Sequence, residues 1–125
     1  MAGLTLDTGA LIALERNDRR AWGFSRIATE RGQPVCVPAG CLAQFWRSNH
    51  PRVARVLAGA TVDALTHRNA LEVGRLLART GTVDVVDASV ALGAVARDQA
   101  VVTSDPDDFE RIASAAGLGL RVLRV

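Results

Sequence analysis

Short apolar, β-branched runs alternate with longer helical patterns along this chain, and that alternation limits its fold more than any other feature. The expected strands lie at 4–6, 34–37, 61–65, 101–103 and 120–125. Parallel neighbours in a sheet need a crossover connection, which is usually a helix. The pattern therefore predicts an α/β fold: a single three-layer α/β/α domain over residues 1–125 with a mostly parallel central sheet.

The helices between these strands are predicted from apolar residues three and four positions apart. They are expected at 10–15, 21–31, 39–47, 51–57 and 67–79, with two more that begin after Asp84 and at Pro106. Thr66 and Asp84 carry side-chain oxygens that can cap the helices following them. Three glycines that tolerate a left-handed backbone are placed to end helices: Gly32, Gly81 and Gly117.

The composition, 49% hydrophobic over 125 residues, is enough for a real core. Four large aromatic side chains are expected in that core: Trp22, Phe24, Phe45 and Trp46. No apolar run approaches the roughly 20 residues that a membrane span needs. Residues 1–14 contain Asp7 and have no basic start, so no signal peptide is expected and the predicted location is cytoplasmic, away from membranes. Cys36 and Cys41 are expected to be buried free thiols.

All fifteen basic residues are arginine, and the chain has no lysine. A P-loop needs a lysine on the phosphates, so that class is excluded. Receiver domains and haloacid-dehalogenase-type phosphatases are also Asp-rich α/β folds that bind magnesium, and they resemble this outline. Both depend on a lysine in the site, which this chain cannot supply.

Outside the candidate acidic site, the chain is strongly basic. Five of the thirteen acids fall in one candidate site, which leaves eight acids against fifteen arginines, a balance of +7. A basic body around an acidic cleft suits a polyanionic substrate; alternatively, these arginines form solvated helix faces. The arginines that we expect to contact the backbone of such a polyanion are Arg16, Arg19, Arg20, Arg52 and Arg55.

Carboxylates cluster at the starts of the last two predicted helices, in 84–87 and 105–108. One acid at a helix N-terminus is ordinary capping, but several acids at one sheet edge repel, and a divalent cation relieves that repulsion. Asp7 ends the first strand, where open parallel sheets bind ligands. On its own it is equally well read as a helix cap. Asp107 is left out of the site because it lies about 100° around the helix from Asp108.

Three segments together carry a resemblance to a known family. They are LDTGALIALE at 6–15, GTVDVVDASVALGAVA at 81–96 and VVTSDPDDF at 101–109. The chain resembles PIN domains over essentially its whole length, and among them the VapC-type toxins, the ribonuclease halves of bacterial toxin–antitoxin pairs. The resemblance implies an endoribonuclease that uses Mg²⁺ or Mn²⁺ to cleave cellular RNA. It also implies an antitoxin partner that binds a groove between the early helices, and a homodimer.

The family's acids map onto this chain one at a time. Asp7, Asp87 and Asp105 match the first, third and fourth acids and are the expected catalytic residues. Asp108 matches a further acid, and Asp84 lies where relatives often have one, so all five are candidate metal ligands. Gln44, Thr8 and Ser104 are candidate supports for those ligands.

Gln44 is the one departure from the family pattern, because relatives usually carry Glu there. Gln offers a carbonyl oxygen but no charge. The site then binds metal more weakly, binds one ion rather than two, or uses Asp84 as a replacement; alternatively, Gln44 is only a polar residue on a half-buried helix. A degenerate site also leaves a second function open, a non-catalytic module that binds RNA or protein.

Overall fold

The computed structural model describes residues 2–125, and over that range the chain forms one sheet of five strands. Every described pair of neighbouring strands is parallel. The order across the sheet is β3-β2-β1-β4-β5. The strands are β1 (Leu4–Leu6), β2 (Val35–Pro38), β3 (Thr61–Asp63), β4 (Ala100–Thr103) and β5 (Val122–Arg124). The predicted parallel sheet is confirmed.

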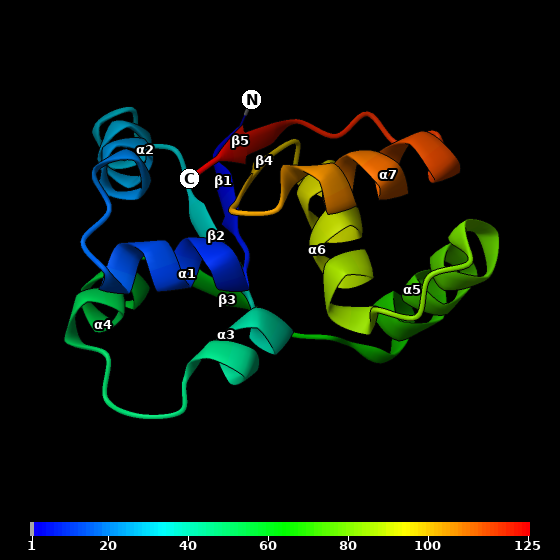
Figure 1. Cartoon of the computed structure of the whole chain (residues 1–125), viewed down its shortest axis with the longest axis horizontal. Helices are drawn as coiled ribbons and strands as arrows, with labels where there is room; N and C mark the ends of the chain where they lie inside the picture. Colours follow the sequence, from blue (N-terminus) through cyan, green and yellow to red (C-terminus); the bar gives the residue numbers. More distant parts are fainter. Residues whose placement is uncertain (1) are drawn as a thin grey trace.

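Helices cover both faces of this sheet. They are α1 (Thr8–Glu15), α2 (Arg19–Glu30), α3 (Ala39–Phe45), α4 (Pro51–Leu57), α5 (His67–Thr80), α6 (Val85–Ala96) and α7 (Pro106–Ala116). Figure 1 shows α1, α2 and α4 on one side of the strands and α5, α6 and α7 on the other, which confirms the three-layer architecture. None of the helices in residues 2–125 is long and apolar enough to cross a membrane.

The predicted helix ends agree with the structure where a cap defines them. The Thr66 side chain accepts a hydrogen bond from the Asn69 N–H, and Asp84 caps α6 in the same way. Gly81 and Gly117 follow their helices with φ of +70° and +66°. The predicted helix at 39–47 ends earlier, at Phe45, because Trp46 leaves the helical conformation with φ of −80° and ψ of 77°.

The core lies along the three central strands, whose residues are buried on both faces. The largest fully buried apolar side chains come from both helical layers and the sheet, among them Leu11, Leu14, Leu76, Val101 and Phe109. Burial on both faces explains why these strands read as continuous apolar runs rather than alternating ones. Cys36 and Cys41 are buried free thiols, as predicted.

Trp46 corrects one expectation about the core. Phe45 is 8% exposed, and Trp22 and Phe24 pack against the core from partly buried positions. Trp46 instead keeps 40% of its surface exposed. The reason is the early end of α3, since Trp46 is the C-terminal cap and its side chain leaves the helix at the surface.

An arginine from the C-terminal end of α6 ties three strands together. The Arg97 guanidinium donates to Asp63 Oδ2 at 2.8 Å, to Gln99 Oε1 at 2.9 Å and to Thr5 Oγ1 at 3.1 Å. The Thr5 hydroxyl donates to the same Gln99 oxygen at 2.8 Å. This network joins β3 at the sheet edge to β1 and to the start of β4, so Arg97 has a structural role that the sequence pattern did not indicate.

Candidate metal centre

The acidic residues meet at the point where the strand order of the parallel sheet reverses, between β1 and β4. From β1 the chain runs to β2 and β3 on one side, and it returns to place β4 and β5 on the other. In such sheets the carboxyl ends of the two strands at the reversal form a crevice that binds ligands. Leu6 pairs with Val102, and the Asp7 N–H donates to the Val102 carbonyl at 3.2 Å. Asp7 therefore lies next to Thr103, which brings the two ends of the sequence together.

A cavity of about 240 Å³ opens at this point. Its lining comes from the starts of α1, α6 and α7 and from α3: Asp7, Thr8, Gly9, Ile12, Gln44, Asp87, Ser104, Asp105, Asp108 and Phe109. Four of the five predicted metal ligands and all three predicted supporting residues are in this set. Asp84 and Asp107 are not part of the lining.

Asp7 occupies both of the roles that its position allows. It caps α1, with Oδ1 accepting from the Ala10 N–H at 2.8 Å, and it also lines the cavity at 8% exposure. Burial raises the pKa of this carboxyl, and the nearby Asp105 charge raises it further. Hydrogen bonds from Thr103 and Ala10 act in the opposite direction. Burial and the Asp105 charge thus oppose ionisation of Asp7, whereas the two hydrogen bonds favour it.

Thr103 is a site residue that the sequence analysis missed. It is fully buried, its side chain is hydrogen-bonded to Asp7, and its Oγ1 accepts the Asp105 N–H at 2.9 Å. One hydroxyl therefore sets the positions of the first and last acids. The available signal was its place at the end of β4, next to the T-S-D motif.

Asp87 is the carboxyl group in the cavity whose pKa is raised most. Burial raises its pKa to about 6, and the charges of Asp84, Asp108 and Asp7 contribute in that order. Asp84 is exposed, and its Oδ1 accepts the Asp87 N–H at 2.9 Å while it caps α6. Asp84 therefore lies outside the cavity but within electrostatic reach of Asp87.

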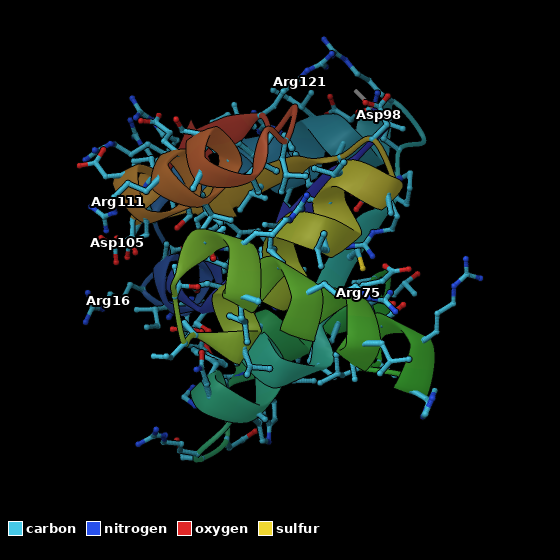
Figure 2. The ribbon with its side chains drawn as sticks, turned by 90° about the vertical axis from the view of Figure 1, so that its right-hand side faces the viewer. Arg16, Arg75, Asp98, Asp105, Arg111 and Arg121 are labelled. Atoms are coloured by element: carbon cyan, nitrogen blue, oxygen red, sulfur yellow. The ribbon has the colours of Figure 1, made fainter. Side chains whose placement is uncertain are left out.

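The two cavity acids at the start of α7, Asp105 and Asp108, differ in their contacts. Within residues 2–125, the Asp105 side chain accepts no hydrogen bond that caps α7, so its exposed carboxylate is left for other contacts. Asp108 is paired with Arg111, one turn later on the same helix. Figure 2 shows Asp105, Arg111 and Arg16 projecting from the same edge of the molecule.

Two close contacts connect the helices around the cavity. A Cβ on Gly9 would lie 2.2 Å from the Ser104 Oγ, so glycine allows the first turn of α1 to approach the β4–α7 connection. The Thr8 hydroxyl donates to Gln44 Oε1 at 2.7 Å, which holds the exposed Gln44 side chain against α1. Gln44 thus belongs to the site, with its carbonyl oxygen already in use.

No protein-family model and no curated protein matches the chain, but solved structures do. VapBC2 from Rickettsia felis, solved bound to a DNA fragment from their promoter, matches with a TM-score of 0.74 and 15% identity over 98% of each chain. DNA-bound VapBC from Salmonella typhimurium matches with a TM-score of 0.70 and 24% identity over 99% of this chain and 98% of that one. The chain has a PIN-like fold. A third match, PAE2754 from Pyrobaculum aerophilum, has a TM-score of 0.58 and 18% identity over 91% and 86%.

The oxygen-only donors of the PIN-like cavity fit a hard divalent cation. Magnesium and manganese prefer carboxylate, carbonyl and water oxygens, and the cavity offers carboxylates from three separate segments. Within residues 2–125, however, no three Asp, Glu, His or Cys side chains are already arranged as ligands of one ion. Burial is the main cause of the raised pKa values of Asp7 and Asp87, and the charges of neighbouring aspartates add to it. A bound cation would offset both effects, because it favours the charged carboxylates.

The five arginines predicted to contact RNA are not gathered around this cavity. Arg16 follows Ile12, a cavity residue, by one helical turn of α1 and is exposed. Arg19 and Arg55 line a larger hollow of about 860 Å³ between α2 and α4. The Arg52 guanidinium donates to the Glu15 carbonyl at 3.0 Å, and Arg20 is exposed on α2. Of the five, Arg16 is the one that the fold brings to the cavity edge.

Proposed function

We propose that the chain is a metal-dependent endoribonuclease that cleaves cellular RNA in the cytoplasm as the toxin of a toxin–antitoxin pair. One observation carries the proposal: four aspartates from three distant segments line one cavity at the point where the PIN-like sheet reverses. The structural likeness to two VapBC complexes supports the toxin role.

Asp7, Asp87 and Asp105 are the proposed ligands of Mg²⁺ or Mn²⁺, with Asp108 and Asp84 beside them. When bound, such an ion makes a coordinated water more acidic and stabilises negative charge on the leaving oxygen of a phosphodiester. The residues of the chain supply the geometry. Thr103 sets the spacing of Asp7 and Asp105, and Asp84 orients the first turn of α6 that carries Asp87.

The partner proposed for this toxin is a cognate antitoxin, bound in the hollow between α2 and α4. The hollow is lined by the apolar faces of Trp22, Val35 and Val56. Arg19, Arg26 and Arg55 also line it, against a single acid, Glu30. Apolar walls with a positive rim suit an amphipathic segment that carries acidic residues.

A homodimer is the proposed assembly, through the surface around edge strand β3. Val62 is 45% exposed, Leu65 is 50% exposed and Val85 is 44% exposed, and Leu65 and Val85 line the same small hollow between α5 and α6. Apolar side chains that gather at a sheet edge are typical of a surface covered by another chain.

The alternative, a PIN-like module that binds RNA or protein without cleaving, is favoured by two contacts. Gln44 supplies no charge and its carbonyl accepts from Thr8, while Arg111 already neutralises Asp108. Both contacts reduce the negative charge available to a metal ion.

Substitution of Asp7 tests the proposal. Asp7→Asn should abolish magnesium-dependent RNA cleavage while leaving the metal-free protein as stable as the parent or more stable, because Asn keeps a capping oxygen and removes a repelled charge. The matched control is Asp107→Asn, at the same cavity edge but outside the lining, which should cleave normally.

Melting in chelator and in excess magnesium gives a second measurement. The parent should gain stability from the ion by mass action, and Asp7→Asn should gain less. Full cleavage by Asp7→Asn with an unchanged magnesium response would overturn the metal-site proposal. A parent that binds RNA but does not cleave it with either metal would favour the binding module.

A further inference from the structure

An exposed aromatic surface adjoins the acidic cavity at the end of α3. Trp46 follows the cavity residue Gln44 by two positions, so their Cα atoms are at most about 7 Å apart. Trp46 is 40% exposed, whereas Phe45 beside it is 8% exposed. The chain then crosses to α4 through the connector drawn below α1 in Figure 1. A large exposed ring thus lies two residues along the chain from a residue that lines the cavity.

The indole is held by other rings rather than left mobile. The His50 ring centroid is 4.2 Å from that of Phe45 and 5.4 Å from that of Trp46, and the His50–Trp46 planes cross at 72°. The Phe45 and Trp46 centroids are 6.4 Å apart. These separations are those of favourable edge-to-face and tilted aromatic pairs. The three rings therefore form a preorganised unit, the aromatic platform Phe45–Trp46–His50.

The end of α1 anchors this platform. His50 Nδ1 lies 3.6 Å from Glu15 Oε1, and the backbone N–H of Arg52 donates to Glu15 Oε2 at 3.3 Å. The Arg52 guanidinium donates to the Glu15 carbonyl at 3.0 Å. Because Asp7 caps the N-terminus of α1, one short helix positions both the acidic cavity and the platform.

Positive charge accompanies the exposed ring. Arg47 follows Trp46, and its Nε donates to the backbone carbonyl oxygen of Gln44 at 3.1 Å. The Arg47 side chain is exposed. Arg16, also exposed, lies one helical turn beyond the cavity residue Ile12. An aromatic face beside arginines is the combination that binds unpaired nucleotides, through stacking on the base and charge on the phosphate.

We propose that Trp46 and Arg47 form a nucleotide subsite next to the cleavage centre, in which an unpaired base stacks on the exposed face of the Trp46 indole. Arg47 holds the phosphate of that nucleotide. This inference rests on the proposed ribonuclease function and deepens it, because it restricts the substrate to RNA that is single-stranded at the nucleotide beside the cut. A base inside a duplex cannot reach the indole, since its faces are already stacked.

Binding in chelator tests this without any cleavage. The probe is a short mixed-sequence oligoribonucleotide without self-complementarity, measured by fluorescence anisotropy. It is compared with a perfectly paired hairpin whose two strands are joined by a non-nucleotide linker, so that the hairpin has no unpaired bases. Trp46→Ala should weaken single-strand binding between about fivefold and one hundredfold, the range found for losing one stacked base. Trp46→Phe, which keeps a stacking face, should retain most of the affinity, and hairpin binding should hardly change.

A control and a spectroscopic signature complete the test. Leu71→Ala removes another exposed apolar side chain, 51% exposed on α5, and should leave both affinities unchanged. In the parent, the single-stranded probe should quench indole fluorescence, and Trp46→Phe should remove that quenching although Trp22 remains. Melting temperatures equal to that of the parent would exclude misfolding.

Three results would overturn the subsite. One is unchanged single-strand affinity in Trp46→Ala, and another is equal loss for single strand and hairpin. The third is normal RNA binding with lost binding of the cognate antitoxin, which would assign the platform to a protein partner. Because the assay contains no metal, its outcome is independent of the cleavage test with Asp7→Asn, and each proposal can fail alone.

Discussion

At the scale of single residues, the acidic cavity makes charged carboxylates costly. The pKa of Asp87 is raised from 3.8 to about 6, chiefly by burial and then by the Asp84 charge. Between those two values the folded protein binds more protons than the unfolded chain, so stability must fall as pH rises through this window. The cost is absent below the lower value, where both states are protonated, and fully present above the upper one.

Asp87→Asn should remove this dependence. In chelator, the parent should lose stability relative to the variant as pH rises from 3.8 to about 6. Urea unfolding of both proteins across that window measures the difference. Excess magnesium should cancel the decline in the parent only. Parallel curves for parent and variant, with Asp107→Asn as the control at an exposed position, would show that the Asp87 charge is not strained.

Gln44 tests how far the site departs from a full set of acids. Gln44→Glu adds a carboxylate to a cavity that already holds four, so manganese should bind about tenfold more tightly or better. Calorimetric titration measures this. Gln44→Ala is the matched control, because it removes the contact with Thr8 without adding charge. Identical manganese affinity in all three proteins would place position 44 outside the reach of the metal and leave Asp84 as the better fourth ligand.

At the scale of elements, the site depends on how closely α1 approaches the connection between β4 and α7. Gly9 allows this approach, since a Cβ there would meet the Ser104 Oγ at 2.2 Å and its backbone nitrogen at 3.1 Å. The Thr103 contacts to Asp7 and Asp105 lie directly beneath. The distance between Asp7 and Asp105 therefore depends on this helix packing as well as on the Thr103 contacts.

Gly9→Ala should reduce the cleavage rate with little effect on the stability of the fold. The new methyl group pushes α1 away from Ser104, and a misplacement on the order of 1 Å at a catalytic centre can reduce the rate about a hundredfold. Stability should change little, because overpacking is partly offset by the better helix propensity of alanine. Gly74→Ala, in α5 with open space around its Cβ, should instead stabilise the protein by about 1 kcal/mol and leave cleavage unchanged. Normal cleavage and magnesium stabilisation in Gly9→Ala would contradict the tight-approach explanation.

At the scale of the whole molecule, the arginines are spread rather than concentrated. Figure 2 shows Arg75 and Arg121 on parts of the surface away from Arg16 and Arg111. Arg97 is committed to Asp63 inside the fold, and Arg52 to Glu15. The net charge of +2 is therefore distributed unevenly. Arg16 and Arg47 lie near the acidic cavity, whereas Arg19, Arg26 and Arg55 line the hollow between α2 and α4.

RNA binding should consequently depend steeply on salt concentration, and this dependence should come from the arginines near the cavity. In chelator, affinity for single-stranded RNA should fall more than tenfold between low and moderate salt through the loss of counterion release. Arg16→Gln should reduce the slope of log affinity against log salt by nearly one, and Arg121→Gln should not. A flat salt response in the parent would remove the basic surface from the account of binding.

The sequence by itself determined the local structure and therefore much of the fold. Strand and helix periodicity, the Thr66 and Asp84 caps and the Gly81 and Gly117 ends act over a few residues, so they are readable without tertiary information. The repeated alternation then leaves a parallel three-layer sheet as the way to bury the apolar runs. The motifs also marked the acids that the cavity brings together.

Only the tertiary structure decided how those acids are held. The strand order puts β1 beside β4, and no local pattern records that choice. The contacts of Thr103 with both Asp7 and Asp105 could therefore not be predicted from the sequence. The placement of Asp84 outside the cavity and the exposure of Trp46 likewise depend on where helices end and pack. Periodicity reports on neighbours in sequence, whereas a site at a sheet reversal is built from residues that become neighbours only after the chain has folded.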